Sequence, residues 1–168
     1  MSPATEPYWT RNSTHRFDDP DKNFGVLYVG DSLETAFAES VIHESSRFDA
    51  KRGRFQVSAS EFNRFVTHFT HPPSEPVLLA DFTGSGLKRL GLNTDLCAGN
   101  DYDCSQAWAK AVHDALPRLG GILYPSRQHS SHRCAVLFER SGVVHQSHRS
   151  MTVRECLELC RLFNVEVV

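Results

Sequence analysis

The sequence predicts an α+β protein with a single domain. Segments with strand-like apolar runs and segments with helical periodicity are intermixed along the chain, so both kinds of element are expected. The spacing lacks the regular β-α-β rhythm of about 30 residues that predicts a doubly wound parallel sheet. The length of 168 residues, with 40% hydrophobic and 23% charged residues, is typical of one globular domain.

The first thirty residues predict an arm, a turn and a strand. Residues 1–15 are mostly polar and are expected to form a loose N-terminal arm, which leaves residues 16–168 as the domain. Three aspartates and a proline at 18–21 are typical of a turn. The apolar run at 25–30, which is bounded by glycines, predicts a buried strand.

A helix is expected next, from Asp31 to residue 43 or 44. Asp31 is the predicted N-cap, and Glu34, three residues later, completes the pattern of a capping box. Apolar residues occupy most of the helix circumference, which is typical of a mostly buried helix. Glu39 lies in the narrow polar sector that remains.

The middle of the chain is less regular. Strands are predicted at 54–57 and 77–82. Residues 60–69 fit either a short helix or a strand, and the His-Pro-Pro sequence that follows ends this segment. The glycine-rich residues 83–86 predict a loop, with a short turn after it.

The last third alternates between helices and strands. An amphipathic helix is predicted at 105–116, and strands are predicted at 121–124 and 133–140. Thr152 and Glu155 form a second capping-box pattern and open a helix to about residue 163. This helix is expected to pack on the core or to form a dimer contact, and a last strand is predicted at 165–168.

Composition excludes several classes of protein. Eighteen basic and twenty acidic residues give a net charge of −2, which argues against binding driven by nucleic-acid phosphates. No apolar run approaches the roughly 20 residues of a membrane helix, and the first residues lack the apolar core of a signal peptide. A cytoplasmic location is therefore expected. Five cysteines without a CxxC pattern are expected to be reduced thiols.

Generic catalytic motifs are absent, and the remaining patterns are weak. The sequence has no phosphate-binding loop, dinucleotide fingerprint, HExxH or GxSxG. The sequence His129-x-x-His132-x-Cys134 contains zinc-type ligands but has no fourth ligand at a matching distance, so no metal site is expected. Cys156 and Cys160, one helical turn apart, are expected to be small core residues.

Four residues have reactive or polar side chains at positions where a functional site could form. Arg16 precedes the first strand, Tyr28 lies on it, Glu39 lies on the helix after it, and Ser126 ends a later strand. Each also has a structural interpretation. In the same order, these are a surface charge, a core aromatic ring, a solvated carboxylate and a turn residue.

Together with their neighbours these residues resemble the RES-domain family, which is named for its Arg, Glu and Ser. The resemblance runs from about residue 16 to about residue 139, with its motifs in the family's order. These motifs are Arg16-Phe17, Val26-Leu27-Tyr28, Ala36-Phe37-Ala38-Glu39, Leu79-Ala80-Asp81-Phe82-Thr83, Gln106-Ala107-Trp108-Ala109, Gly121-Ile122-x-Tyr124-x-Ser126-Arg127 and Ala135-Val136-Leu137-Phe138.

The resemblance implies a fold similar to that of ADP-ribosyltransferases, with a mixed or antiparallel sheet. It implies an enzyme that takes NAD as substrate, uses no separate cofactor, and cleaves the nicotinamide–ribose bond by hydrolysis or phosphorolysis. Many relatives are toxins of bacterial toxin–antitoxin pairs, so a cognate antitoxin is an expected partner. Transfer of ADP-ribose to a protein and a degenerate nucleotide-binding module remain alternatives.

The resemblance also assigns roles. Glu39 is expected to stabilise the cationic ribose and to orient the attacking nucleophile. Arg16, with Arg127 as a second candidate, suits the pyrophosphate, because a guanidinium binds two oxygens at once. Tyr28 is expected to stack on nicotinamide or a ribose edge, and Ser126 to donate to a ribose hydroxyl or the carboxamide.

One family feature has no clear counterpart. Many relatives carry a further arginine on a strand well upstream of the Arg-Phe pair. Only fifteen residues precede Arg16, and Arg11 lies too close to it for the family spacing. Either the first strand is shortened or that role is lost, and the short N-terminus is the feature that favours the degenerate module.

Overall fold

The computed structural model describes residues 8–43, 47–72 and 76–168 and confirms the α+β class. Its centre is a four-stranded sheet in the order β1-β7-β6-β5. β5 and β6 are parallel, and the other neighbours are antiparallel, so the sheet is mixed as expected. The strands are β1 (Val26–Gly30), β7 (Arg133–Phe138), β6 (Gly121–Pro125) and β5 (Leu79–Asp81).

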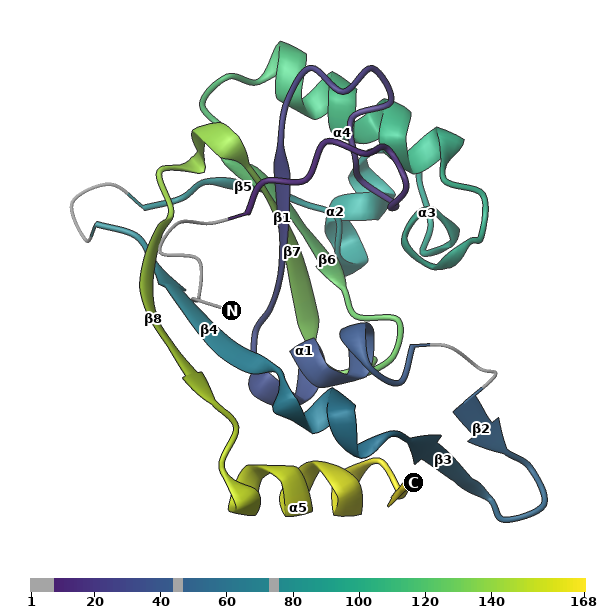
Figure 1. The fold of residues 1–168 in the computed structure, drawn as a ribbon. Coiled ribbons are helices and arrows are strands. Elements are labelled where there is room, and N and C mark those ends of the chain that lie inside the picture. The colour runs from purple at the N-terminus through teal and green to yellow at the C-terminus, as the bar shows by residue number, and fades with distance from the viewer. Residues whose placement is uncertain (1–7, 44–46, 73–75) are drawn as a thin grey trace.

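Three helices cover one face of this sheet (Figure 1). They are α2 (Gly84–Arg89), α3 (Asp95–Ala98) and α4 (Asp103–Ala115). Alternate strand residues point toward them, because successive side chains of a strand face opposite sides. Val26, Ile122 and Val136 are fully buried there, with Phe17, Phe82 and Phe138. This sheet-and-helix layer is the first apolar cluster.

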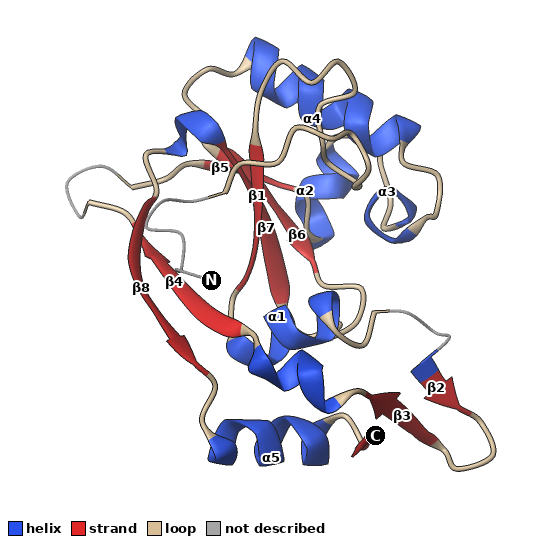
Figure 2. Cartoon of the chain, in the orientation of Figure 1, coloured by secondary structure: helices blue, strands red, loops and turns tan. Residues whose placement is uncertain are grey.

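A second apolar cluster surrounds α1 (Leu33–Ser40). It includes the small sheet β2-β3-β9, whose strands are β2 (Phe48–Asp49), β3 (Arg54–Val57) and β9 (Val165–Val167). It also includes α5 (Val153–Leu162) and a short 3-10 helix at Ala59–Asn63, at the opposite end of the molecule from α4 (Figure 2). Phe37 of α1 is buried here with Val57 and Leu159.

A two-stranded ribbon flanks the other side of the central sheet (Figure 1). It pairs β4 (Phe65–Thr70) with β8 (Val144–Ser150) in antiparallel register, with an irregularity after His68. A 3-10 turn at Glu139–Ser141 leads from β7 into it. The two alternatives for residues 60–69 both occur, since a 3-10 helix precedes the strand.

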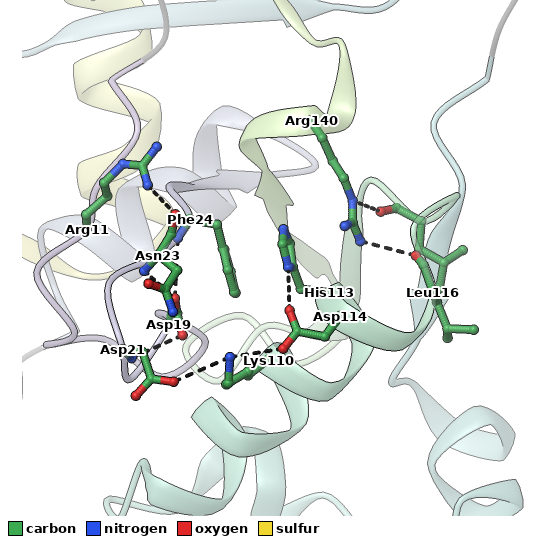
Figure 3. A network of polar contacts seen from close by, with 11 residues as sticks. Arg11, Asp19, Asp21, Asn23, Phe24, Lys110, His113, Asp114, Leu116 and Arg140 are labelled. Atoms are coloured by element: carbon green, nitrogen blue, oxygen red, sulfur yellow. Dashed lines mark hydrogen bonds and ion pairs between the residues drawn. The ribbon is translucent and has the colours of Figure 1, made fainter.

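A polar network ties the segment before β1 to α4 (Figure 3). Asp19 accepts hydrogen bonds from three backbone N–H groups of the 21–24 turn, and Lys110 bridges Asp21 and Asp114 at 3.4 and 2.9 Å. The Phe24 ring stacks on His113 with centroids 3.8 Å apart. The predicted turn at 18–21 is therefore fixed against α4, together with the chain that carries Arg16.

Two local expectations were wrong. Ser32, not Asp31, caps α1: its hydroxyl accepts from the Thr35 N–H at 3.1 Å. Asp31 instead accepts from the Thr35 hydroxyl and the Arg133 N–H, so no capping box with Glu34 forms. The helix also ends at Ser40, several residues earlier than expected.

The predicted loop and turn at 83–90 form helix α2. The helix was not predicted because it contains two glycines, and glycine is a poor helix former. A side chain at Gly86 would collide with the carbonyl of Asp81, so close packing on the end of β5 requires glycine there. The helix buries Leu87 in the first cluster. The short elements α3 and β2 were not predicted, and neither was the seven-residue strand β8.

Most other boundaries shift by a few residues, as is usual at element ends. The strand expected at 77–82 is the shorter β5, and the helix expected at 105–116 begins at Asp103. The capping box of Thr152 and Glu155 is confirmed. In α5, Leu159 and Cys160 face inward more than Val153 and Leu157, which are 77% and 53% exposed.

The N-terminal arm lies partly outside the described residues, which begin at Tyr8. Thr10 forms an isolated antiparallel bridge with Val26, and the division of the chain at residue 16 stays a prediction. All five cysteines are thiols without a disulfide, as expected. Among the described residues, no helix has the length and apolar character needed to cross a membrane.

Candidate active site

Glu39 and the loop after β6 meet at one end of the central sheet. A single carboxylate oxygen of Glu39, Oε1, accepts hydrogen bonds from the Ser126 hydroxyl at 2.6 Å, the Arg127 N–H at 2.8 Å and the Gln128 N–H at 3.2 Å. Oε2 takes no hydrogen bond from the residues that the structure describes. The carboxylate is thus fixed by one oxygen, and the other is available to a ligand.

Ser126 is buried and its hydroxyl is fully used. It donates to Glu39 and accepts from the His129 N–H at 2.9 Å, while its own N–H donates to His132 O at 3.0 Å. Phe163, at the end of α5, supports the same loop, since its ring lies 5.6 Å from His129 and 6.1 Å from Phe37 of α1. The geometry makes Ser126 the clamp between helix α1 and the loop.

Tyr28 is anchored by the segment that carries Arg16. Its hydroxyl donates to Asp18 Oδ1 at 3.0 Å and accepts from the Phe17 N–H at 2.9 Å. The other Asp18 oxygen accepts from the N–H groups of Thr14 and His15, so this fully buried carboxylate organises the turn. Burial, followed by the charge of Asp18, raises the pKa of Tyr28 well above 10. The phenol therefore stays neutral and its ring is held in place.

Tyr124 connects the two charged groups. It lies two residues before Ser126, is 9% exposed, and feels the opposing charges of Arg16 and Glu39. Burial, then the neighbouring Cys134 and Glu39, raises the pKa of Tyr124 well above 10, and Arg16 lowers it. Burial raises the pKa of the Cys134 thiol to about 12, and Glu39 adds to this rise. Both groups are uncharged at neutral pH.

The two arginines approach from different segments. The Arg16 guanidinium lies over the Tyr102 ring, 4.8 Å from its centroid, and donates to Leu96 O at 3.4 Å. Arg127 donates through Nη1 to Asn100 Oδ1 at 3.1 Å. Neither guanidinium forms an ion pair with a carboxylate of the described chain. Their charges are therefore uncompensated and suited to an anion.

These residues line one cleft with a volume of about 1110 Å³. It extends around β1 toward the β4–β8 ribbon, where Val29 and Leu137 form part of its wall. The lining residues around Glu39 are His15, Arg16, Tyr28, Cys97, Tyr102, Tyr124, Arg127, Gln128 and Cys134. Arg16, Tyr28, Glu39 and Arg127 are thus brought together as the sequence implied, and Ser126 lies directly behind Glu39.

Other residues considered from the sequence have structural contacts of their own. Arg11 pairs with Glu139 and donates to Asn23 O, and it does not line the cleft. His129 and His132 stack with centroids 4.0 Å apart, and His132 contacts Asp31. No three His, Cys, Asp or Glu side chains are grouped for a metal within the described ranges. The absence of a metal site stays a prediction.

Sequence reasoning missed Asp18, Asn100, Tyr102 and Tyr124 as site residues. Tyr124 carried a signal, because it lies on β6 only two residues before Ser126 and within the same motif. Asp18 stood beside the Arg16-Phe17 pair but was assigned only to a turn. Asn100 and Tyr102 lie between two helices, and nothing local places them near Arg16 or Arg127.

The chain is similar to known proteins. A family model described as "RES domain" matches residues 2–155. The "Probable toxin y4kH" of Sinorhizobium fredii (strain NBRC 101917 / NGR234) is 29% identical over 92 residues, which are 54% of this chain and 69% of that protein.

A solved structure shows the same fold. A chain from the crystal structure of the M. tuberculosis MbcT–MbcA toxin–antitoxin complex aligns with a TM-score of 0.61 at 16% sequence identity. The alignment covers 89% of this chain and 78% of that chain. At this identity the match concerns the architecture, which was the expected one.

Proposed function

Because this chain belongs to the RES domain family, we propose that it cleaves the nicotinamide–ribose bond of NAD and acts as the toxin of a toxin–antitoxin pair. The observation that carries the proposal is the Glu39 carboxylate, fixed through Oε1 with Oε2 available, in a cleft that also holds two arginines without carboxylate partners. A carboxylate in the same cleft as two arginines with which it forms no ion pair suits a ligand that is anionic at one end and becomes cationic at the reacting carbon.

The proposed reaction needs little general acid catalysis from the protein. The nicotinamide of NAD leaves as a neutral molecule, so its departure needs no proton, and positive charge builds up on the ribose. A fixed carboxylate stabilises this charge without reorganising, which is the main source of electrostatic catalysis. Glu39 Oε2 is assigned this role. It also accepts a proton or a hydrogen bond from the attacking water in hydrolysis.

The other cleft residues bind and position. Arg16 and Arg127 are assigned to the pyrophosphate. The Tyr28 ring is assigned to stacking on nicotinamide or the ribose edge, while its hydroxyl stays bound to Asp18. Ser126 is assigned to holding Glu39, because its only proton is donated to that carboxylate. In this assignment NAD is the substrate and no further cofactor takes part.

The toxin assignment rests on relatives. One relative carries the name of a probable toxin, and the structural match comes from a toxin–antitoxin complex. A cognate antitoxin is therefore the proposed protein partner, and no direct contact with nucleic acid is part of the proposal. Co-expression with the neighbouring reading frame, followed by co-purification and growth assays, tests this part separately.

The central test is nicotinamide release from NAD by the purified protein, with and without phosphate. Glu39→Gln keeps the size of the side chain and removes its charge, so release should fall by about 100-fold or more. Glu34→Gln makes the same change five residues earlier on α1, outside the cleft, and should retain activity. Circular dichroism confirms that both variants fold.

The outcomes separate the alternatives. A rate that depends on phosphate indicates phosphorolysis, and a rate independent of it indicates hydrolysis. Modification of lysate proteins by ADP-ribose, detected by mass spectrometry, would redirect the assignment to protein ADP-ribosylation. Full activity of Glu39→Gln, or no release from folded wild-type protein, would overturn the proposal and favour a module that binds nucleotides without turnover.

A further inference from the structure

A single segment, which runs from within α3 to the start of α4, contacts two of the four arginines that line the cleft. Leu96 and Tyr102 contact Arg16, and Asn100 contacts Arg127. Arg16 comes from the turn before β1, and Arg127 from the loop after β6. Two groups that are distant in sequence are therefore held from one side by a run of seven residues, 96–102.

All three contacts are made by uncharged groups. Arg16 meets the face of an aromatic ring and a backbone carbonyl, and Arg127 meets an amide oxygen. An aromatic ring or an amide fixes the direction of a guanidinium while leaving its net charge in place. A carboxylate in the same position would fix it equally well and would cancel the charge.

Several other arginines are paired with carboxylates, whereas Arg140, outside the cleft, is held like Arg16 by backbone carbonyls and an aromatic ring. Arg52 pairs with Glu166 at 2.9 Å, Arg149 with Glu155 at 2.6 Å, and Arg154 with Glu158 at 2.8 Å. These three ion pairs lie outside the first cluster: one is at the small sheet β2-β3-β9, one joins β8 to α5, and one is within α5. Arg64 and Arg149, which line the cleft at the ribbon, are paired with carboxylates, so within the cleft the neutral partners distinguish Arg16 and Arg127.

We propose that residues 96–102 form a positioning segment, in which Tyr102 and Asn100 hold Arg16 and Arg127 pre-oriented and charged for the diphosphate group of the ligand. The inference rests on the proposed function for the identity of the ligand as NAD. A pre-oriented guanidinium loses less side-chain freedom on binding, so the segment strengthens affinity. Tyr102 and Asn100 are positioning residues, and they act on binding rather than on bond cleavage.

Because Tyr102 and Asn100 act on binding, their substitution should change KM more than kcat. An interaction made equally with substrate and transition state changes KM and leaves kcat nearly constant. Tyr102→Ala should raise KM for NAD by about 5- to 30-fold, the range expected for a partly desolvated cation–π contact. Tyr102→Phe keeps the ring and should restore most of the affinity, because no hydrogen bond of the Tyr102 hydroxyl holds Arg16.

Asn100→Asp is the decisive variant. It keeps an oxygen in place for Arg127 and strengthens that contact, so thermal stability should stay the same or rise. It also cancels the charge that the ligand needs, so KM should rise about as much as in Tyr102→Ala. A purely structural role of Asn100 predicts unchanged KM in this variant. Asn63→Asp and Tyr8→Ala, on exposed positions outside the cleft, are the matched controls and should match wild type.

A binding measurement keeps the inference independent of turnover. Calorimetric titration with ADP-ribose, which carries the diphosphate but no bond to cleave, should show the same loss of affinity in Tyr102→Ala and Asn100→Asp. If wild type releases no nicotinamide but these variants weaken ADP-ribose binding, the proposed reaction is wrong and the positioning segment stands. Unchanged KM and unchanged ADP-ribose affinity in both variants would refute the segment while leaving the reaction intact.

Discussion

The Glu39 carboxylate is fixed by three donors on one oxygen, and two of them are backbone N–H groups. Backbone donors keep their positions when neighbouring side chains change, so the carboxylate direction depends on the shape of the 126–128 loop. That loop is in turn shaped by the Ser126 hydroxyl, which binds Glu39 and the His129 N–H together. Ser126 thus holds the Glu39 carboxylate and the 126–128 loop in position.

Removal of the Ser126 hydroxyl tests this at the residue scale. Ser126→Ala breaks a hydrogen bond to a carboxylate and leaves the His129 N–H without its partner, so the free energy of unfolding should fall by about 1–3 kcal/mol. NAD cleavage should fall as well, through kcat, because Glu39 is less well fixed. Urea unfolding and steady-state kinetics measure the two effects. Ser130→Ala, on an exposed residue of the same loop, should change neither.

Thiol reactivity gives a second residue-scale prediction. Burial raises the pKa of Cys97 to about 11 and that of Cys134 to about 12, so both thiols stay protonated at pH 8. Because the thiolate is the nucleophile, native protein should react with iodoacetamide at the exposed Cys104 and not at these two positions. Mass spectrometry after brief alkylation identifies the sites. Labelling of Cys134 at the rate of Cys104 would contradict the buried position.

The elements differ in how far the sequence could predict them. β1 and β6 carry apolar runs, β3 alternates polar and apolar residues, and α5 has both its capping box and its periodicity. β8 was missed because Val144–Ser150 contains a single apolar residue and lies in a ribbon exposed to solvent. α2 was missed because it contains two glycines, one of which, Gly86, serves a close contact with β5 that only the folded chain makes.

The residues of the candidate site also differ in how far the sequence could predict them. Residues inside local motifs, such as Arg16 and Glu39, could be assigned from the resemblance and their order. Asn100, Tyr102 and Asp18 act through contacts with segments that are distant in sequence or through buried backbone donors. Such contacts have no local pattern, so sequence alone could not reveal them.

The capping box of α5 gives an element-scale prediction. The pKa of Glu155 falls from 4.5 to about 2, first because Arg149 binds it and then because the Thr152 N–H and hydroxyl do. A lowered folded-state pKa adds stability above the unfolded pKa, and this stability is lost as pH falls through the folded value. Glu155→Gln should therefore be less stable than wild type at pH 7.

The difference between wild type and Glu155→Gln should shrink as pH falls from about 4.5 toward 2. Urea unfolding at pH 7, 5, 4 and 3 measures it. Glu158→Gln on the same helix removes only an exposed ion pair with Arg154 and should have little effect on stability. A stability difference that is constant across this pH range would show that Glu155 acts without its charge.

The whole molecule contains two apolar clusters, and the candidate site joins them. Glu39 lies on α1, which belongs to the second cluster, and it binds a loop that extends from the central sheet of the first. Phe163 contacts both Phe37 on α1 and His129 in that loop. The C-terminal helix therefore supports the site without contributing a residue to the chemistry.

Phe163→Ala tests this support at the scale of the molecule. Loss of the half-buried ring should lower the free energy of unfolding by about 2–4 kcal/mol. NAD cleavage should fall in folded protein too, because α1 and the 126–132 loop lose a shared contact. Leu162→Ala, on the exposed neighbour, should change both much less. Stability loss with an unchanged kcat would show that α5 supports only the second cluster.

The pairing of β3 with β9 also has a consequence for synthesis on the ribosome. Every residue assigned to chemistry in the cleft has been added to the growing chain once residue 127 is in place. Three residues that pack in the cluster around α1 are added some thirty to forty residues later. They are Leu159, Phe163 and Val165. A nascent chain therefore holds all of its reactive groups before it can align them. Activity should begin abruptly, when the last helix and strand have left the exit tunnel and closed over α1.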